Sequence, residues 1–285
     1  MSGAMQAVRS AARALAAAGV EASETCAEWL LSDLLRASRP SLYVDPRPLT
    51  DEQREQFSWW VDQVCAGVPP AYLTQRVWFY GLPLVVRPGV FIPRPETEVL
   101  VETVVERLRA RRTEPMVAVD VGTGTGNIAI SLTKLLPACR MVAVDCSEQA
   151  VAVARENVAA HGMVDRVHLV KLDARELLVG AQPLLDMIVS NPPYIASGEI
   201  STLPAVVRSE PLQALDGGED GLATIRCLIE HSPEALRSSG WLALEIGEEQ
   251  AASVVSLIDR TRAFHTIEVK QDLAGRDRVV LAQRR

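Results

Sequence analysis

The fold is decided by residues 116–126, which read Met-Val-Ala-Val-Asp-Val-Gly-Thr-Gly-Thr-Gly. The first six are mostly apolar and rich in valine, as expected of a strand buried in a parallel sheet. Residues 127–136 follow at once with the apolar spacing of a helix. A glycine-rich turn between a strand and a helix lets a ligand approach the backbone, because glycine has no Cβ. The segment therefore predicts a ligand site at the carboxyl end of a strand.

The glycine spacing indicates the kind of ligand. A dinucleotide-binding turn reads Gly-x-Gly-x-x-Gly, whereas here the third glycine comes one residue early and Asn127 follows it. This pattern argues against NAD and favours a nucleoside ligand without a pyrophosphate, such as S-adenosylmethionine (SAM). The residues expected to contact it are Gly122, Thr123, Gly124, Thr125 and Gly126.

An acid stands at the end of the next predicted strand. Asp145 follows the run 140–144 and lies 19 residues beyond Gly126. A carboxylate in this place can accept hydrogen bonds from both ribose hydroxyls. The alternative is that Asp145 or Ser147 caps the following helix, which is predicted over 148–161.

A second acid, Asp173, ends the apolar run 167–172. Together with Ala174 it is expected beside the adenine, where its carboxylate can accept from the amino group. A turn residue at the end of a strand is an equally good explanation of Asp173.

The tetrapeptide Asn191-Pro192-Pro193-Tyr194 closes a third apolar run, 184–190. Two prolines fix φ and donate no hydrogen bonds, so the strand stops and a stiff loop follows. The Asn191 side-chain oxygen and the Pro192 carbonyl can accept both hydrogens of a planar NH₂ group, while Tyr194 covers its flat face. The loop therefore predicts transfer of a group to nitrogen, with Asn191, Pro192 and Tyr194 as catalytic residues. A rigid turn with a capping asparagine is the alternative.

Strands and helices alternate from residue 116 onward, which implies a parallel sheet with right-handed crossovers. The remaining strands are expected over 240–247, 265–271 and 278–283, with helices near 222–238 and 248–262. Only a short turn separates the last two strands, so they form an antiparallel hairpin. The expected fold class is α/β, a Rossmann-like seven-stranded, mostly parallel sheet with one antiparallel strand. This is the class I SAM-dependent methyltransferase architecture, here with a small N-terminal helical domain.

Three domains or segments are expected along the chain. Residues 1–75 show helical patterns and no strands, which predicts a helical bundle, and one exposed face of this bundle is expected to bind the substrate protein. Residues 76–92 contain a β-hairpin linker with Gly81 at its turn, and residues 93–285 form the methyltransferase domain. Pro95 is expected in the first turn of a helix that runs to about residue 111.

Two capping boxes are predicted within the helical bundle. Thr25-x-x-Glu28 and Thr50-x-x-Gln53 both precede apolar helical patterns, and a threonine followed three residues later by Glu or Gln is typical of a helix start.

Composition excludes several classes of protein. A net charge of −7 argues against a broad phosphate-binding face, so a nucleic-acid partner is not expected. The five cysteines are scattered without a Cys-x-x-Cys, and the four histidines show no ligand spacing. Neither a disulfide framework nor a metal site is therefore predicted.

The N-terminus allows two interpretations. Residues 1–19 contain arginines and many alanines but no acid, which also describes mitochondrial transit peptides. We favour a first domain helix ending at Gly19, because Ala, Leu and Arg are strong helix formers. No apolar stretch approaches the ~20 residues that span a bilayer. A cytoplasmic location is expected, with a mitochondrial one as the alternative, and the chain is expected to be a monomer.

The chain resembles the HemK/PrmC family of peptide chain release factor glutamine N5-methyltransferases. The segments that carry the resemblance are Phe91-Ile92-Pro93-Arg94-Pro95-Glu96-Thr97-Glu98, the glycine loop 122–126, Asn191 to Tyr194, the loop 210–221 and the tail 272–278. The Asn-Pro-Pro-Tyr motif is widespread among amino-methyltransferases, whereas the segment 91–98 is much more particular to the glutamine enzymes.

The resemblance implies a cofactor, a substrate and their sites. The cofactor is SAM, and the substrate is the glutamine of the Gly-Gly-Gln loop of a class 1 release factor. Cofactor binding falls on residues 122–126, Asp145 and Asn191, and substrate binding on residues 191–194.

The chain departs from the family pattern at two places. Ala174 and Arg175 stand where an aromatic residue often follows the acid of the third strand, and Gln75 stands where glycine is frequent.

Other charged residues near these motifs leave alternatives open. Arg94 and Glu96 either line the substrate channel or form a structural salt bridge. Glu98 and Glu245 are candidates for a general base by position only. The loop 210–221 is expected as a mobile rim over the site, with a plain capped loop as the alternative.

Two other functions share some of these features. A nucleic-acid methyltransferase acting on the exocyclic amine of adenine or guanine would use the Asn-Pro-Pro-Tyr loop in the same way, but needs a basic groove. A non-catalytic SAM-binding scaffold would not need Asn191 and Tyr194 intact.

Overall fold

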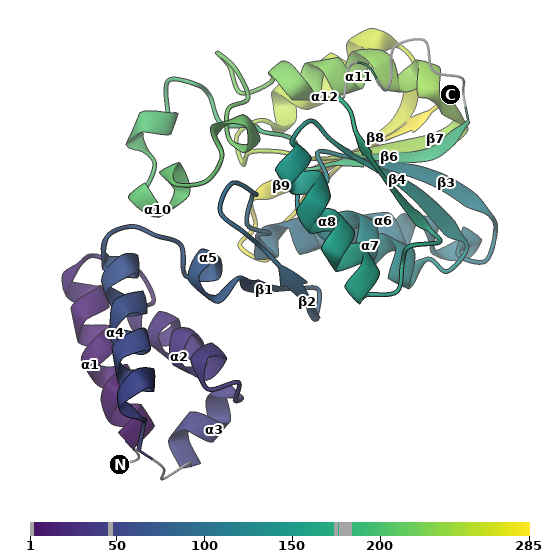
Figure 1. The fold of residues 1–285 in the computed structure, drawn as a ribbon. Coiled ribbons are helices and arrows are strands. Elements are labelled where there is room, and N and C mark those ends of the chain that lie inside the picture. Colours follow the sequence, from purple (N-terminus) through teal and green to yellow (C-terminus); the bar gives the residue numbers. More distant parts are fainter. Residues whose placement is uncertain (1–2, 45–47, 174–175, 177–183) are drawn as a thin grey trace. The chain divides into compact units, whose positions relative to one another are not determined.

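The computed structural model describes residues 3–44, 48–173, 176 and 184–285. They form two compact units. Figure 1 colours the ribbon by position in the sequence, from purple at the N-terminus to yellow at the C-terminus. The first unit comprises Met1–Arg76 and Pro204–Ser209, and the second comprises Val77–Leu203 and Glu210–Arg285. Each has a hydrophobic core of its own.

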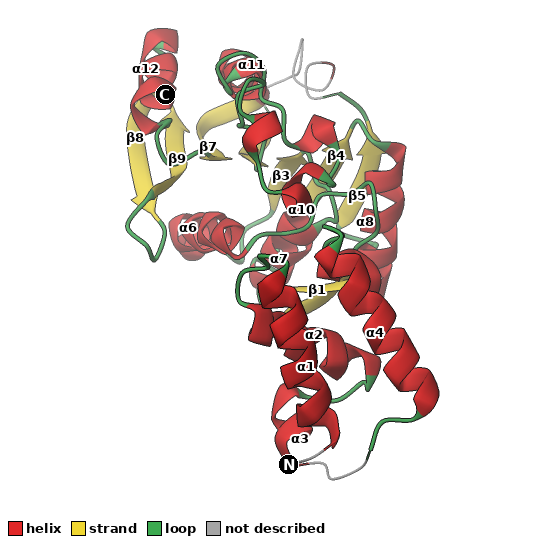
Figure 2. Cartoon of the chain, turned by 90° about the vertical axis from the view of Figure 1, so that its left-hand side faces the viewer, coloured by secondary structure: helices red, strands yellow, loops and turns green. Residues whose placement is uncertain are grey.

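The first unit is helical (Figure 2, red). Its helices are α1 (Gly3–Ala17), α2 (Ser23–Leu34), α3 (Arg39–Val44), α4 (Asp51–Cys65), α5 (Pro70–Thr74) and α10 (Ala205–Arg208). Val8 and Leu15 of α1 pack with Leu30 of α2 and Phe57 of α4, and all four are buried. Residues 3–17 therefore contribute to the domain core, as expected of a first domain helix.

One of the two predicted capping boxes is confirmed. Thr50 accepts from the backbone N of Gln53 at 3.2 Å, and the Gln53 side chain accepts from Thr50 N at 3.0 Å. The other prediction is wrong, because α2 begins at Ser23 and Thr25 lies inside it. The N-cap there is Ala22, whose carbonyl accepts the first helical hydrogen bond from Cys26 N at 2.9 Å.

The second unit begins within β1 (Arg76–Phe79), which forms a hairpin with β2 (Leu82–Val85). Tyr80 and Gly81 form its two-residue turn, and both have positive φ, 50° and 70°. Such turns match the twist of the paired strands. The Asn157 carboxamide accepts from Val85 N at 2.7 Å and donates to the Val85 carbonyl at 2.9 Å, which fastens the hairpin to the following domain.

A seven-stranded sheet forms the centre of this unit, in the order β5-β4-β3-β6-β7-β9-β8. The strands are β3 (Met116–Val121), β4 (Cys139–Asp145), β5 (Val167–Lys171), β6 (Leu185–Ser190), β7 (Leu236–Glu245), β8 (Phe264–Gln271) and β9 (Asp277–Arg284). Only β9 runs against its neighbours. The predicted fold class and the predicted terminal hairpin are confirmed.

Helices cover both faces of the sheet (Figure 1). One face carries α6 (Glu98–Leu108), α7 (Asn127–Leu135) and α8 (Glu148–Ala160), and the other carries α11 (Ala223–Ala235) and α12 (Ala251–Thr261). Pro95 begins a short 3₁₀ turn, Pro95–Thr97, that leads directly into α6, as predicted. Val119 of β3, Ile188 of β6 and Leu242 of β7 are buried between the layers.

The boundary between α11 and β7 lies earlier than the sequence indicates. A helix was expected to residue 238 and a strand from residue 240, but α11 ends at Ala235 and β7 starts at Leu236. Pro233 lies in the last turn of the helix, where it supplies no donor for another helical bond. Leu236 instead pairs with Leu185 at the start of β6, before a register shift.

Among the helices of the described residues, none is both long and apolar enough to cross a membrane.

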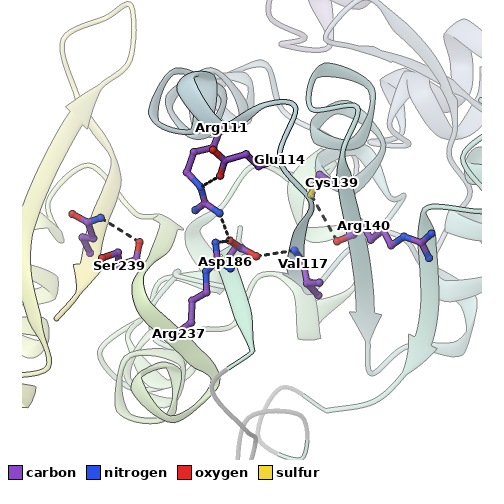
Figure 3. Close-up of polar contacts among 9 residues, drawn as sticks. Arg111, Glu114, Val117, Cys139, Arg140, Asp186, Arg237 and Ser239 are labelled. Carbon is purple, nitrogen blue, oxygen red and sulfur yellow. Dashed lines mark hydrogen bonds and ion pairs between the residues drawn. The ribbon is translucent and has the colours of Figure 1, made fainter.

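The buried carboxylate of Asp186 joins strands at the amino-terminal edge of the sheet (Figure 3). It accepts hydrogen bonds from Arg111 Nη2 at 2.8 Å and from Val117 N at 2.9 Å, and it also pairs with Arg237. Arg111 is shared with Glu114, whose carboxylate lies 2.9 Å away and is 58% exposed. Asp186 thus holds β3, β6 and β7 together at the edge where β6 begins.

We expect Asp186→Asn to lower the free energy of unfolding by about 1–3 kcal/mol, because it removes the acceptor charge shared by two guanidinium groups. Glu114→Gln is the matched control and should change it by less than about 0.5 kcal/mol, since that pair is exposed. Urea unfolding at pH 7 measures both. Equal losses for the two variants would contradict the role of Asp186.

Gln75, the residue that caps the carboxyl end of α5, has a left-handed backbone conformation. Gln75 has φ 55° and ψ 25°, and it occupies the position where glycine is frequent in the family that the motifs indicate. A side chain in this region costs about 1–2 kcal/mol relative to glycine. The tight turn is therefore present, although its residue is unfavourable.

We expect Gln75→Gly to raise the free energy of unfolding by about 0.5–1 kcal/mol, because relief of the strained backbone exceeds the added entropy of the unfolded chain. Gln75→Ala is the control, since it keeps the Cβ and should leave stability nearly unchanged. Thermal unfolding compares the three proteins. A glycine variant no more stable than the alanine variant would show that the turn carries no strain.

Candidate active site

The carboxyl ends of three neighbouring strands meet at one edge of the sheet. The register pairs Val121 of β3 with Ser190 of β6, and β7 lies parallel to β6 on its other side. The glycine loop 122–126, Asn191 and Glu245 are thereby brought together, as ligand-binding residues are in open α/β sheets. Ser190 Oγ donates to the Val121 carbonyl at 2.7 Å, which fixes the two strands where both end.

The glycine loop is open at its middle and packed at its end. Gly122, Gly124 and Gly126 all have positive φ, 74°, 55° and 81°. Chain neighbours aside, none of the described residues comes within 4 Å of where a Cβ on Gly124 would stand. The same position on Gly126 meets Ala154 and Ile130 at 3.4 Å. A ligand can therefore reach the backbone at Gly124, while Gly126 allows close packing against α8.

The two threonines of the loop turn their side chains into the protein. Thr123 Oγ1 donates to Asp120 Oδ2 at 2.7 Å, and Thr125 Oγ1 donates to Asn127 Oδ1 at 3.3 Å. Both threonines are buried. Their hydroxyl groups are therefore not available to a ligand, and Thr123 N and both carbonyl groups already take part in hydrogen bonds within the protein.

Asp120 is a site residue that the motifs do not indicate. It is fully buried in β3, and its Oδ1 has no hydrogen-bond partner among the described residues. Burial raises the pKa of this carboxyl to about 7, and the hydrogen bond from Thr123 and the nearby backbone N–H of Ala129 oppose the shift. A single acid within a run of valines was the available signal, because such a charge is costly unless something compensates it.

Asp145 lies between the glycine loop and the start of α8. Its Oδ2 accepts from Gly124 N and its Oδ1 from Ser147 N, both at 2.9 Å. The helix cap is Ser147, whose side chain accepts from Ala150 N at 3.3 Å. Burial raises the pKa of Asp145, and these two backbone hydrogen bonds oppose the shift. Of the two candidates for capping, Ser147 is the one that caps α8.

Asp173 follows β5 and is exposed. Ala174 and Arg175 lie outside the described residues, so the contact expected with an adenine stays a prediction.

The carboxamide of Asn191 has a defined orientation. Its Nδ2 donates to Thr97 Oγ1 at 3.1 Å, and Thr97 is buried in the turn that precedes α6. The side-chain oxygen of Asn191 is therefore the end directed away from Thr97. Among the described residues, the Pro192 carbonyl takes part in no hydrogen bond, so a second acceptor stands next to it.

The rest of the Asn-Pro-Pro-Tyr loop is held by its backbone. Ile195 N donates to the Leu215 carbonyl at 3.1 Å, and Gly217 N donates to the Ile195 carbonyl at 2.8 Å. Gln250 Nε2 donates to the Tyr194 carbonyl at 2.9 Å. The loop 210–221 thus pairs with the segment directly after the motif and supports it.

Tyr194 keeps its hydroxyl proton over the whole physiological range. Burial raises the pKa of the phenol to about 12, and the nearby charge of Glu245 adds to the shift. Arg278 and Arg94 act in the opposite direction.

Arg94 forms an ion pair with Glu210, a carboxylate that is 1% exposed. Glu210 also accepts from Ile92 N at 3.0 Å, and the Arg94 guanidinium lies 5.1 Å from the centre of the Phe91 ring. Burial raises the pKa of Glu210, with Arg94 opposing. These contacts fasten the start of the loop 210–221 to the segment 91–98. The structural salt bridge is thus formed, and a substrate contact by Arg94 stays a prediction.

Glu96 and Glu98, which flank Thr97 in the sequence, have different environments. Glu96 is exposed, and its charge raises the pKa of Glu245 and of Tyr194. Glu98 accepts from the backbone N of Tyr80 at 2.7 Å. It therefore anchors the turn of the β1–β2 hairpin.

Glu245, the last residue of β7, lies close to Thr97 and Tyr194. It is 1% exposed, and burial raises its pKa to about 7. The nearby hydroxyl groups of Thr97 and Tyr194 and the charge of Arg278 oppose the shift. Glu245 Oε2 is buried and has no hydrogen-bond partner among the described residues. Arg278 is held by Asp272, at 3.2 Å, so the tail motif 272–278 contributes a charge to this site.

Within the part of the chain that the structure describes, no group of three or more His, Cys, Asp or Glu side chains could hold a metal ion.

Two family models match the chain. One is described as the PrmC N-terminal domain and matches residues 6–74, and the other as the methyltransferase small domain and matches residues 82–218.

Close relatives cover nearly the whole sequence. The release factor glutamine methyltransferase of Moorella thermoacetica is 43% identical over 281 residues, which is 98% of this chain and 98% of that protein. The protein of the same name from Thermosynechococcus vestitus is 40% identical over 250 residues, 87% of this chain and 84% of that protein.

A related solved structure has a similar name. The protein-(glutamine-N5) methyltransferase (release factor-specific) from Alicyclobacillus acidocaldarius is 32% identical, covers 70% of this chain and 98% of that chain, and has a TM-score of 0.42. The resemblance drawn from the motifs is confirmed, and the chain belongs to the family of release factor glutamine methyltransferases.

Proposed function

We propose that this protein transfers a methyl group from SAM to the side-chain amide nitrogen, N5, of the glutamine in the Gly-Gly-Gln loop of class 1 peptide chain release factors. The observation that carries the proposal is the oriented carboxamide of Asn191, whose NH₂ group is bound by Thr97. Its oxygen is left to accept a hydrogen from a substrate amide beside the glycine loop. Family membership supports the same reaction and substrate.

The residues around the glycine loop fit SAM. The open backbone at Gly124 can contact the ligand. The buried Oδ1 of Asp120, which has no partner among the described residues, suits an ammonium group such as that of the methionine part. Each oxygen of Asp145 accepts one backbone hydrogen bond, which leaves lone pairs for the ribose hydroxyls. When bound, SAM supplies a methyl group on a positively charged sulfur, which is a good leaving group.

The protein's contribution to the reaction is alignment. An amide nitrogen is a poor nucleophile because its lone pair is delocalised into the carbonyl. Asn191 Oδ1 and the Pro192 carbonyl accept the two amide hydrogens and stabilise the positive charge that grows on nitrogen. Fixed dipoles of this kind contribute on the order of 10²–10³ in rate, and orientation supplies roughly 7–11 kcal/mol.

Other residues complete the two binding sites in this proposal. The loop that contains Thr123 and Thr125 borders the cofactor, and Asp173 and Ala174 stay its predicted neighbours at the adenine. Pro193 and Tyr194 hold the flat face of the substrate amide. Arg94 and Glu96 stand at the edge of the same site.

We assign residues 1–75 to recognition of the release factor, 76–92 to a linking hairpin and 93–285 to methyl transfer. The side chain of Trp59 in α4 is 51% exposed, and large aromatic side chains are frequent anchors in protein interfaces. The monomeric state, the lack of a nucleic-acid substrate and the cytoplasmic location stay predictions from the sequence.

Incubation with methyl-labelled SAM and, separately, a class 1 release factor, RNA and DNA tests the proposal. We expect one methyl group on the release factor, and mass spectrometry should locate it on the glutamine of the Gly-Gly-Gln loop. A release factor with that glutamine replaced should take up no label. Label in RNA or DNA, with none in the release factor, would favour the nucleic-acid alternative.

We expect Asn191→Ala to lower kcat on the release factor by on the order of 10²–10³, because one of two acceptors for the substrate amide is removed. The affinity for SAM, measured by calorimetry, should change by less than about threefold, since the glycine loop and the acids remain. Near-native turnover would refute the role of Asn191. A loss of SAM affinity as large as the loss in kcat would show that Asn191 acts mainly as the cofactor residue that the family resemblance implies.

We expect Asp145→Asn to raise the Kd for SAM by about tenfold or more, because hydrogen bonds to a charged acceptor contribute about 1.5–3 kcal/mol. Ser147→Ala is the matched control two residues away. It removes the cap of α8 and should lower stability by about 1 kcal/mol while leaving the SAM affinity unchanged. An unchanged affinity of Asp145→Asn for SAM would contradict the proposal that Asp145 accepts hydrogen bonds from the ribose hydroxyls.

A further inference from the structure

A buried asparagine of α8 joins two backbone segments that are distant in the sequence. Asn157 is 1% exposed. Its Oδ1 accepts from Val85 N at 2.7 Å, and its Nδ2 donates to the Val85 and Thr125 carbonyl groups, each at 2.9 Å. Val85 is the last residue of β2, and Thr125 belongs to the glycine loop 122–126. One side chain therefore contacts both the β1–β2 hairpin and the loop that is proposed to bind SAM.

The hydrogen count fixes the orientation of this carboxamide. A carboxamide has two hydrogens on its nitrogen and an oxygen that only accepts. In Asn157 each hydrogen is used for one carbonyl group, and the oxygen meets the Val85 N–H. The reversed orientation would place the oxygen against both carbonyl groups and the NH₂ group against that N–H. The bond to Thr125 therefore needs the NH₂ group of an amide at this position.

The bond to Thr125 fixes the last peptide group of the glycine loop. Gly126 N donates to the Thr123 carbonyl at 2.8 Å, while Asn157 binds the carbonyl of the same peptide group. Gly126 has a positive φ of 81°, and a Cβ there would meet Ala154 of α8 at 3.4 Å. Ala154 and Asn157 are three residues apart, so they lie on the same face of the helix. This face of α8 thus sets the shape of the second half of the loop.

The hairpin has other polar contacts with the surrounding helices. His161 Nε2 donates to the Pro83 carbonyl at 2.8 Å, which is a second contact of α8 with β2. Tyr80 N donates to Glu98 of α6 at 2.7 Å. Of these three contacts, that of Asn157 is the one that also includes a residue of the glycine loop.

The hairpin leads directly to a segment of the candidate active site. Five residues separate Val85 from Phe91, where the segment 91–98 begins. That segment contains Thr97, which accepts the hydrogen bond from Asn191. The contact made by Asn157 therefore joins the glycine loop to the stretch of chain that continues into the site of the proposed acceptor.

We propose that Asn157 is a positioning residue for the cofactor, which holds the glycine loop in its binding conformation and couples that conformation to the β1–β2 hairpin. The inference rests on the proposed function, because it takes residues 122–126 as the loop that binds SAM. Asn157 touches no ligand in this arrangement and acts through the Thr125 carbonyl. Because coupling between two sites is reciprocal, SAM that fixes the loop should also stabilise the hairpin at Val85.

Two substitutions on α8 separate the loop from the hairpin. Asn157→Asp keeps the size of the side chain and an acceptor for Val85 N, but an ionised carboxylate cannot donate to the Thr125 carbonyl. His161→Ala is the matched control, because it removes a contact with the hairpin and none with the loop. We expect the Kd for SAM, measured by calorimetry, to rise about tenfold or more in Asn157→Asp and to stay within about threefold in His161→Ala. Equal affinities of the two variants would overturn the proposal.

Steady-state kinetics on the release factor distinguish positioning of the cofactor from a merely structural role. In Asn157→Asp, the KM for SAM should rise about tenfold or more, while kcat at saturating SAM stays within about threefold of the native value. A residue that only kept the protein folded would change the amount of active protein, so its loss would lower kcat and leave KM unchanged. That second result would refute the role of Asn157 in cofactor binding.

Hydrogen exchange of the native protein tests the coupling without any substitution, and it therefore decides even if Asn157→Asp does not fold. Saturating SAM should slow the exchange of the Val85 N–H about fivefold or more, because this N–H bonds to the side chain that also holds the loop. The Tyr80 N–H is the control, since Glu98 binds it at the turn of the same hairpin, and its exchange should change less than about twofold. Equal slowing at both positions, or none at Val85, would contradict the coupling.

The exchange measurement also separates this inference from the proposed function, because it needs no release factor. If SAM slows exchange at Val85 and no release factor is methylated, the proposed reaction fails and the coupling holds. If the release factor is methylated and exchange at Val85 does not respond to SAM, the coupling fails alone.

Discussion

The structure depends on the register of the central parallel strands. Val121 pairs with Ser190, and the Ser190 hydroxyl donates a hydrogen bond to the Val121 carbonyl at the last residue of both strands. A shift of one residue would turn every side chain of β6 to the opposite face of the sheet. Asn191 would then leave the edge that it shares with the glycine loop. At the other end of β6, Asp186 forms a buried ion pair with Arg111 and accepts a hydrogen bond from Val117 N of β3. The two strands are therefore fixed to each other at both ends.

The Asn-Pro-Pro-Tyr loop is rigid for reasons beyond its prolines. The backbone that follows Pro193 is paired with the loop 210–221, and Gln250 bonds to the Tyr194 carbonyl. The start of that loop is fastened by the pair of Arg94 and Glu210. Segments that are distant in the sequence therefore fix the positions of the two acceptors, Asn191 Oδ1 and the Pro192 carbonyl. Preorganised acceptors contribute more to the rate than mobile ones, because little reorganisation is needed during the reaction.

Local patterns predicted much of this arrangement. The valine run, the glycine loop, the hairpin turn at Gly81 and the antiparallel end of the sheet all follow from short-range rules. The start of α2 and the start of β7 were misplaced, because a left-handed Ala22 and the pairing of Leu236 with Leu185 override the local signal. The hydrogen bonds of Asn191 with Thr97 and of Asp120 with Thr123 could not be predicted from the motifs. They depend on which strands are neighbours, which no single motif states.

The central claim is that Asn191 Oδ1 and the Pro192 carbonyl together hold the amide that receives the methyl group. A crystal structure of the protein with S-adenosylhomocysteine and a Gly-Gly-Gln peptide tests it most directly. The account predicts the glutamine nitrogen within hydrogen-bond distance of both oxygens, with the sulfur of the cofactor product on its open side. A glutamine bound elsewhere, or an Asn191 oxygen turned toward Thr97, would contradict it.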